Sequence, residues 1–417
     1  MNSVFAARRQ AVAATLEDQS AWFLFSGQTK QRSLDGDYPF CVNRNFFYLT
    51  GLDQPDYILQ VTKLGGEVKE TIYLPRPDPY LEMYHGAMPT AAEICEETGV
   101  DTAIYLYKLD WELNSLFARN YFQHLYMDFH KRELDTTAYP ENDLARRIVG
   151  AHPYLQQHNI ARTIDNLRRI KDPGEIADIR EAIRLTGLGI DSILRHMGPG
   201  VNERQLQAYF EFELKYHGAM GNAFYPIIAA GANTVNLHYE RNNRDLAEGD
   251  LLLLDLGAEY GYYSADISRT FPVSGTFTSR QRYYYEAVLA AEQAVIDALR
   301  PGLPVDETLE IARDKLFEYC VQDGLTREWA DMEKLLPHGV SHYLGLDTHD
   351  VGDRELLKPG MVVTVEPGIY LREEGLGVRI EDDVLITEDG RQVLSSQILK
   401  TPAEIENFVS QVKEMKG

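Results

Sequence analysis

The chain has 417 residues, a formal net charge of −23, 44% hydrophobic residues and 25% charged residues, a composition typical of a soluble globular protein. The acidity disfavours nucleic acids and anionic membranes as partners, because both reward basic surface. No apolar run approaches the roughly 18 residues of a membrane span, and the three cysteines form neither a CxxC pair nor a disulfide framework. We therefore expect a cytoplasmic protein with at least two domains.

The first part of the chain alternates segments typical of strands and of helices. Aromatic and β-branched residues bounded by Gly, Pro or Asp predict strands at 21–27, 46–52, 57–64 and 70–77. Helix-like patterns follow at 90–100 and 113–122. We expect these segments to form an α/β domain over residues 1–165.

A helix is predicted to open the second domain, residues 166–417. Asp172-Pro173 is a favourable helix start, and Glu175 places an acid in the first turn. Isoleucines 176, 179 and 183 then follow at helical spacing.

The second domain contains a faint internal repeat. Residues 191–214 resemble residues 297–316: in each, a helix ends at Pro-Gly, a helix with an acidic start follows, and strand-forming residues lie downstream. This predicts two α/β halves related by a pseudo-two-fold axis, with a site between them. The expected fold class is mixed α/β (α+β).

Two aspartates lie within apolar, strand-forming runs of the segment 249–275. If Tyr260-Gly261 forms a two-residue turn, Asp255 and Asp266 face each other, with Cβ atoms about 5 Å apart. Two like charges opposite each other in a leucine-rich strand destabilise a sheet unless a cation lies between them. The alternatives are one protonated aspartate or two loop caps, and the flanking leucines favour the cation.

A second pair of carboxylates recurs near the C-terminus. Glu366 follows one apolar strand and Glu381 ends another, so a longer hairpin centred between residues 373 and 374 would oppose them. For Glu381 a solvated acidic strand end is the alternative, because two further aspartates follow it.

A nitrogen ligand is available among three histidines, His338, His342 and His349. His338 and His342 are four residues apart, as in a zinc-protease helix, but Gly339 occupies the position of the required glutamate. One imidazole with four carboxylates favours Mn²⁺, with Co²⁺, Fe²⁺ or Zn²⁺ as alternatives. Four anionic ligands suit two divalent ions better than one, and two ions can share a bridging hydroxide that attacks at neutral pH. Hydrolysis is the expected chemistry.

Four motifs carry a resemblance to a known family: DLGAEYGYYSADISRTFPVSG, HGVSHYLGLDTHDVG, TVEPGIY and GVRIEDDVLIT. Together they resemble the proline-specific branch of the pita-bread metallopeptidases, which comprises Xaa-Pro aminopeptidase (aminopeptidase P) and Xaa-Pro dipeptidase (prolidase). The likeness extends to LRRIKDPGEIADIR, GANTVNLHYERNN and DYPFCVNRNFFYLTGL, and so covers nearly the whole chain. It implies a creatinase-like α/β domain over 1–165 and a catalytic pita-bread domain over 166–417.

The resemblance also implies a role for each matching residue. The implied metal ligands are Asp255, Asp266, His342, Glu366 and Glu381. Asp266 and Glu381 would bridge two ions, and Glu366 would also shuttle a proton between the bridging water and the departing amine. The implied catalytic or substrate-contacting residues are His238, His349, His338 and Arg379, of which the first two would stabilise the tetrahedral intermediate.

The implied substrates are peptides with proline at the second position. An Xaa-Pro bond lacks an N–H and its ring fixes φ, so a pocket of aromatic residues and histidines can recognise the ring. A homo-oligomer, either a dimer or a tetramer, is also implied. One position departs from the family: in EMYHG, Tyr84 stands where aminopeptidase P often has a tryptophan that enters a neighbouring subunit's site.

Three alternative functions compete with the aminopeptidase. A dipeptidase restricted to Xaa-Pro uses the same chemistry, and DYPFCVNRNFFYLTG leans towards the aminopeptidase. Metal-free creatine hydrolysis and a non-catalytic binding module both go with a degraded ligand set, whereas all five ligand residues are present here. No P-loop, dinucleotide fingerprint or GxSxG elbow indicates another chemistry.

Overall fold

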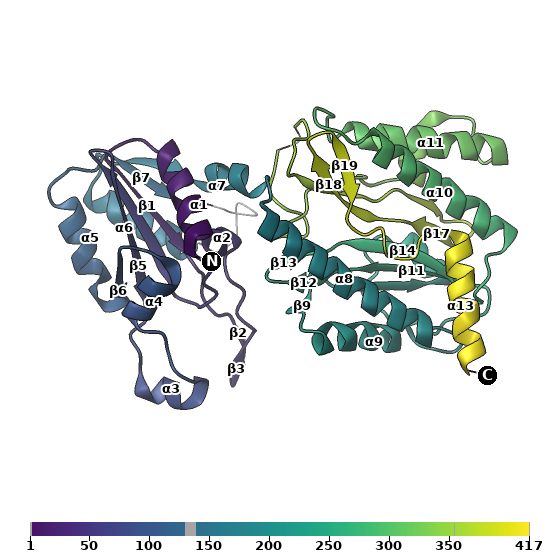
Figure 1. The fold of residues 1–417 in the computed structure, drawn as a ribbon, viewed down its shortest axis with the longest axis horizontal. Coiled ribbons are helices and arrows are strands. Elements are labelled where there is room, and N and C mark those ends of the chain that lie inside the picture. The colour runs from purple at the N-terminus through teal and green to yellow at the C-terminus, as the bar shows by residue number, and fades with distance from the viewer. Residues whose placement is uncertain (1, 130–138, 354, 417) are drawn as a thin grey trace. The chain divides into compact units, whose positions relative to one another are not determined.

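The computed structural model describes residues 2–129, 139–353 and 355–416. The chain divides into two units, Met1–Arg168 and Arg169–Gly417, each with its own strands and helices (Figure 1). The division predicted after residue 165 falls within α7 (Ala161–Arg168), close to this boundary.

A six-stranded mixed sheet is the centre of the first unit, in the order β6-β5-β4-β1-β7-β8. Its strands are β1 (Ser20–Phe25), β4 (Ile58–Leu64), β5 (Glu67–Leu74), β6 (Thr102–Tyr105), β7 (His124–Met127) and β8 (Gln156–Asn159). The predicted strands at 21–27, 57–64 and 70–77 are confirmed, although β5 begins and ends earlier than expected. A small hairpin, β2 (Gln31–Ser33) with β3 (Gly36–Asp37), stands apart from this sheet.

The helices of the first unit are α1 (Asn2–Thr15), α2 (Arg44–Thr50), α3 (Pro79–His85), α4 (Ala91–Thr98), α5 (Leu109–Phe117), α6 (Pro140–Ala151) and α7. An apolar cluster that includes Phe23, Phe117 and Leu144 packs α5 and α6 against the sheet. The predicted helix at 90–100 is confirmed by α4. The helix predicted at 113–122 is wrong beyond Phe117, because Asn120 takes a left-handed φ of 55° that ends the helical path.

The strand predicted at 46–52 is wrong, because these residues form most of α2. The side chain of Asn43 accepts hydrogen bonds from the backbone N–H groups of Asn45 and Phe46, which caps the helix start. Gly51, with φ 73°, caps the other end. Phe46 and Leu49 are buried three residues apart on one helical face, so local capping decides against the strand propensity of the aromatic run.

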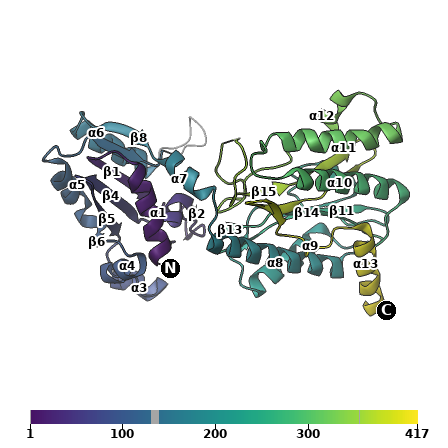
Figure 2. The ribbon, with the colours of Figure 1, turned by 45° about the horizontal axis from the view of Figure 1, so that its top comes forward.

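The second unit repeats one arrangement of helices and strands. The first half pairs α8 (Pro173–His196) with α9 (Glu203–Tyr216), and the second pairs α10 (Ser279–Ala298) with α11 (Glu307–Asp323). Antiparallel strands follow each pair: β10 (Ile227–Ala230), β11 (Leu251–Leu256) and β14 (Ile267–Pro272), then β15 (Val362–Val365), β18 (Asp382–Thr387) and β19 (Gly390–Val393). In Figure 2, α10 and α11 run along the top of this unit and α8 and α9 along its bottom. The predicted repeat is confirmed.

Seven further helices and strands belong to the second unit. They are β9 (Gly221–Asn222), β12 (Ala258–Tyr260), β13 (Tyr263–Ser264), α12 (Met332–Leu335), β16 (Gly368–Leu371), β17 (Leu376–Arg379) and α13 (Pro402–Lys416). Among the helices of the described residues, none has the length and apolar character that crossing a bilayer requires.

The predicted start of α8 is confirmed. The carboxylate of Asp172 accepts from the backbone N–H groups of Gly174 and Glu175 at 2.8 and 3.0 Å, and Pro173 occupies the first turn. The Glu175 carboxylate accepts a hydrogen bond from the Asp172 N–H at 2.9 Å and another from the hydroxyl of Tyr263 at 2.7 Å. This cap therefore joins α8 to β13, three residues before Asp266.

Candidate metal centre

The hairpin that carries the first carboxylate pair turns one residue later than predicted. Its turn is Gly261-Tyr262, with φ of 55° and 70°, and Tyr260 pairs with Tyr263. The predicted turn at Tyr260-Gly261 is therefore wrong. Glycine takes the positive φ of the first central position, where the prediction had placed a tyrosine.

As a result, Asp255 faces Ser268 on β14 instead of facing Asp266 directly. The observed partner of Asp255 is thus two residues further along the chain than the predicted one, and the side chains of a strand alternate faces with a period of two. Asp266 consequently stays on the face of Asp255, as a diagonal neighbour instead of a direct one. Gly257 marks the break between β11 and β12, since a Cβ there would lie 2.0 Å from the carbonyl oxygen of Ala265.

The second carboxylate pair has the predicted register. Val365 pairs with Asp382 and Gly368 pairs with Arg379, and both pairings are centred between residues 373 and 374. Glu366 and Glu381 lie opposite each other between these two ladders. The alternative of a solvated strand end for Glu381 is wrong, because Glu381 and the two aspartates after it are all buried.

All five predicted metal ligands converge in the second unit. Potential ligand atoms lie within 4.8 Å of one another in Asp255, Asp266 and Glu381, and again in His342, Glu366 and Glu381. The Nε2 atom of His342 is 3.4 Å from Asp266 Oδ2 and 3.4 Å from Glu366 Oε1. These five residues line one cavity of about 350 Å³, together with His238, His338, His349 and Arg379.

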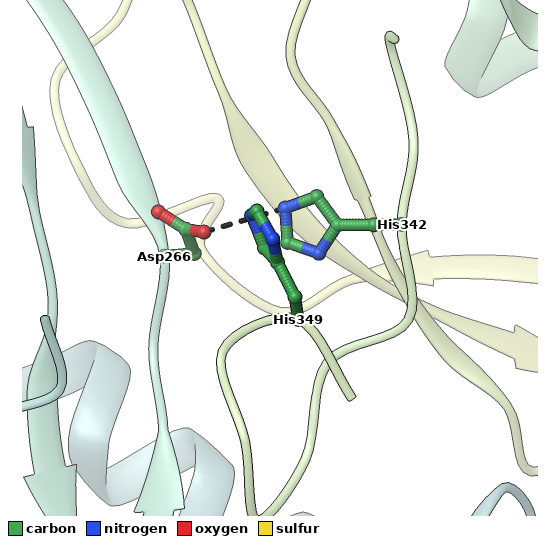
Figure 3. A group of neighbouring side chains, drawn as sticks. All are labelled: Asp266, His342 and His349. Atoms are coloured by element: carbon green, nitrogen blue, oxygen red, sulfur yellow. Dashed lines mark ion pairs between the residues drawn. The ribbon is translucent and has the colours of Figure 1, made fainter. Parts of the chain in front are cut away.

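His349 lies beside two of the proposed metal ligands. Its ring centroid is 4.2 Å from that of His342, and it forms a third group of neighbouring donor atoms with Asp266 and His342. Figure 3 shows the His349 ring beside the line that joins the Asp266 carboxylate to His342. Partial burial and the adjacent His342 lower the pKa of His349, which keeps its imidazole neutral near pH 7.

The electrostatics of the cavity fit cation binding. Burial, followed by the neighbouring carboxylates, raises the pKa of Asp266 and of Glu381 well above the usual range, and burial raises the pKa of Glu366 to about 7. The Oδ1 atom of Asp255 is buried, and no hydrogen-bond partner reaches it from the described residues. An oxygen-rich set with one imidazole and an unsatisfied buried oxygen suits divalent cations.

His342 presents the nitrogen that a metal needs. Its Nδ1 lies 3.1 Å from the carbonyl oxygen of Tyr343. A carbonyl oxygen only accepts, so Nδ1 carries the proton and the lone pair of Nε2 faces Asp266 and Glu366.

Arg379 ties Asp255 to a chain of polar groups. Its buried guanidinium donates to Asp255 Oδ2 at 2.6 Å, to the hydroxyl of Ser268 at 2.8 Å and to that of Tyr370 at 2.9 Å. The Tyr370 hydroxyl in turn lies 2.9 Å from Nε2 of His338. Burial lowers the pKa of His338 to about 4, so its neutral ring accepts from Tyr370.

Sequence reasoning missed three residues that support this site: Tyr370, Ser268 and Arg269. Arg269 is fully buried and its five N–H donors all find acceptors, including the carbonyl oxygens of Glu381 at 2.5 Å and of Ser268 at 2.9 Å. It thereby holds the backbone that carries Glu381. Tyr370 ends the TVEPGIY motif and Arg269 lies in the ISRT run, so their place within matching motifs was the available signal.

Comparison with known proteins points in one direction. Residues 177–388 match the model of metallopeptidase family M24, and residues 5–126 match that of the aminopeptidase P N-terminal domain. The chain is 33% identical to an Xaa-Pro aminopeptidase of Haemophilus influenzae, over 97% of each chain. Its structure is similar to that of aminopeptidase P from Escherichia coli with the inhibitor Pro-Leu, with a TM-score of 0.92, 30% identity and 99% of each chain covered. It is also similar to a Bacillus anthracis structure with a provisional aminopeptidase P designation, with a TM-score of 0.96, 41% identity and 98% of each chain covered.

Proposed function

Since the chain belongs to metallopeptidase family M24 and carries the N-terminal domain of aminopeptidase P, we propose that it is an Xaa-Pro aminopeptidase. It would hydrolyse the bond between an N-terminal residue and a penultimate proline. The N-terminal α/β domain precedes a pita-bread domain that carries the chemistry. The observation that supports this most directly is the convergence of four carboxylates and one imidazole in a single cavity.

Five residues would hold the metal in this proposal: Asp255, Asp266, His342, Glu366 and Glu381. Glu381 belongs to both groups of carboxylate-rich ligands, which supports a bridging role between two ions, shared with Asp266. When bound, a pair of divalent ions, preferably Mn²⁺, supplies a water acidic enough to attack a peptide carbonyl at neutral pH.

Glu366 would move the proton that the reaction requires. The attacking water must lose a proton, and the prolyl nitrogen must gain one as it leaves. Glu366 lines the cavity beside the other proposed ligands, where a carboxylate can accept that proton and then return it. The carboxylate of Glu366 also lies 3.4 Å from His342 Nε2, so the same group can serve as ligand and proton carrier.

The remaining polar side chains of the cavity would bind the peptide. His238 and His349 line the cavity and would donate to the carbonyl oxygen, which becomes negative when the water attacks. His338 and Arg379 would shape the pocket through their shared contact with Tyr370.

A homo-oligomer, dimer or tetramer, fits the surface of α3. Tyr80, Met83 and Tyr84 are 64%, 69% and 62% exposed there, and an exposed apolar cluster of this kind marks a contact surface. We propose that Tyr84 replaces the tryptophan that aminopeptidase P often inserts into a neighbouring subunit's site. A cytoplasmic location fits the three cysteines, which are all unbridged.

A peptide-length assay tests the proposed function. With Mn²⁺ added, the protein should release the first residue from Xaa-Pro-Yaa-Zaa, and should leave Xaa-Ala-Yaa-Zaa intact. Cleavage confined to the dipeptide Xaa-Pro would identify a dipeptidase instead. An absence of turnover on every Xaa-Pro peptide, with each of Mn²⁺, Co²⁺, Fe²⁺ and Zn²⁺, would indicate a binding protein.

A further inference from the structure

We infer that Glu203 is a positioning residue for His238, since its carboxylate organises the loop that brings His238 to the cavity. This inference rests on the proposed function, in which His238 contacts the substrate. His238 lines the cavity from the connection between β10 and β11, outside any strand that could fix its direction. Something other than sheet hydrogen bonds must therefore hold this stretch of backbone.

The Glu203 carboxylate accepts four hydrogen bonds, three from this connection and one from Ala230, the last residue of β10. One oxygen accepts from the Ala230 N–H at 2.8 Å and from the Asn233 side chain at 3.1 Å. The other accepts from the Tyr239 hydroxyl at 2.8 Å and from the Arg244 N–H at 2.9 Å. The side chain is fully buried, and the four donors come from both sides of His238 in the sequence. This one carboxylate therefore connects the chain before His238 to the chain after it.

The two neighbours of His238 anchor the backbone on either side of it. Leu237 and Tyr239 pack against an apolar cluster that includes Val235, Leu253 and Tyr370. His238 lies between them and remains exposed on the cavity side. Because Tyr239 is also bound to Glu203, the backbone immediately after His238 is held by both packing and a hydrogen bond.

A second buried polar residue holds the far end of the loop. Asn242 adopts a left-handed φ of 44°, which asparagine tolerates better than most residues. Its side-chain oxygen accepts from the Ile228 N–H at 3.1 Å, and its amide donates to Gln207 at 3.0 Å and to the Pro226 carbonyl at 2.8 Å. The loop is therefore fastened before and after the histidine.

Only a carboxylate satisfies four donors at this point. An ionised carboxylate is acceptor-only on both oxygens, whereas the amide of glutamine would turn two N–H groups toward two of the donors. The substitution Glu203→Gln keeps the side-chain size and removes at least two of the four hydrogen bonds. It should loosen the loop, and a small displacement of a substrate-contacting group lowers the rate strongly.

A double-mutant cycle tests the inference. Glu203→Gln should lower kcat/KM about tenfold or more on an Xaa-Pro-Yaa-Zaa peptide in the otherwise unchanged enzyme. In an enzyme that already carries His238→Ala, the same change should cost less than about twofold, because the group that Glu203 positions is gone. The Mn²⁺ content should be the same in the parent, the two single variants and the double variant. A general loss of structure would lower the Mn²⁺ content.

Two further variants keep the test decisive. Glu240→Gln makes the same chemical change at an exposed carboxylate two residues from His238, and kcat/KM should not change. Tyr239→Phe removes one donor to Glu203, so it should lower kcat/KM by a smaller factor than Glu203→Gln, and again only when His238 is present. It replaces Glu203→Gln in the test if the glutamine variant fails to fold. Equal losses with and without His238 would overturn the inference. An unchanged rate for His238→Ala alone would remove the role proposed for His238, and this inference with it.

Discussion

Four carboxylates share one cavity, and this arrangement opposes folding until a cation is present. Burial and mutual repulsion raise the pKa of Asp266 and Glu381 well above the usual range, with Arg379 as the buried cation in contact with Asp255. Buried charges are retained in proteins when they are paired or bind metals. The site residues therefore lower the stability of the metal-free protein and raise its affinity for divalent cations.

Asp266→Asn should separate these two effects. Peptide hydrolysis should fall by about 10³-fold or more, because asparagine supplies a weaker, neutral ligand at a position shared by two groups of donors. At neutral pH the metal-free variant should melt a few degrees higher than the metal-free parent, since Asp266 must hold a proton to stay neutral in the cavity whereas asparagine is neutral without one. Scanning calorimetry without metal, beside a peptide assay with Mn²⁺, measures both. A lower melting temperature for the metal-free variant would contradict the electrostatic argument.

At this scale the sequence identified the residues proposed as ligands but not the residues that hold them. The four carboxylates could be found because a carboxylate within or at the end of an apolar strand has few structural explanations, and the family motifs then selected His342 among the histidines. Arg269 and Tyr370 could not be found in this way, since an arginine or tyrosine in a strand has many ordinary roles. Their role depends on which carbonyl or hydroxyl group lies beside them after folding.

Among the elements, one hairpin register follows the sequence and the other does not. The β15–β18 and β16–β17 pairings have the predicted centre. The β12–β13 turn lies one residue later than predicted, because Gly261 can take either central position of a two-residue turn and takes the first one here. The strand predicted at 46–52 failed because the Asn43 cap and Gly51 specify a helix whatever the aromatic content.

The cap of α8 carries a prediction at this scale. Asp172→Ala removes two backbone hydrogen bonds and should lower the free energy of unfolding by about 1 kcal/mol. Activity of the folded enzyme should remain close to that of the parent, because the metal ligands are held by other contacts. Urea denaturation followed by circular dichroism measures the first quantity. A loss of activity at temperatures where the variant is fully folded would show that the cap also positions β13, through Tyr263.

For the whole molecule, composition and the internal repeat predicted two α/β parts, the second with two similar halves. The residue at which one unit gives way to the next could not be fixed, because α7 ends one unit directly before the segment that leads into α8. A helix pattern shows where a helix begins and ends, and it does not show against which core the helix packs.

The stability of the whole molecule should depend on pH and metal together. In the metal-free fold, Asp266, Glu366 and Glu381 keep protons above the pH, about 4, at which the unfolded chain releases them. Metal-free stability should therefore fall as the pH rises from about 4 to 7. Divalent ions displace those protons, so Mn²⁺ should raise the melting temperature more at pH 8 than at pH 5.

Differential scanning calorimetry at both pH values, with Mn²⁺ or with a chelator, measures this dependence. Titration calorimetry in two buffers of different ionisation enthalpy should also show protons released on binding. Asp266→Asn serves as the control, and the gain from Mn²⁺ should be much smaller in it at pH 8. An equal gain at pH 5 and pH 8 for the parent enzyme would mean that the carboxylates are already ionised in the metal-free fold.

The hairpin that carries Asp255 and Asp266 also limits how this chain can change in length. One residue inserted within its paired strands would turn one acid to the opposite side of the ribbon and break up the donor set, whereas two would leave both on the same side. A residue added at the tip, between Gly261 and Tyr262, would lengthen the loop and leave both pairings as they are. The number of strand residues between each aspartate and the tip is therefore a criterion for judging whether a distant homologue keeps the donor set.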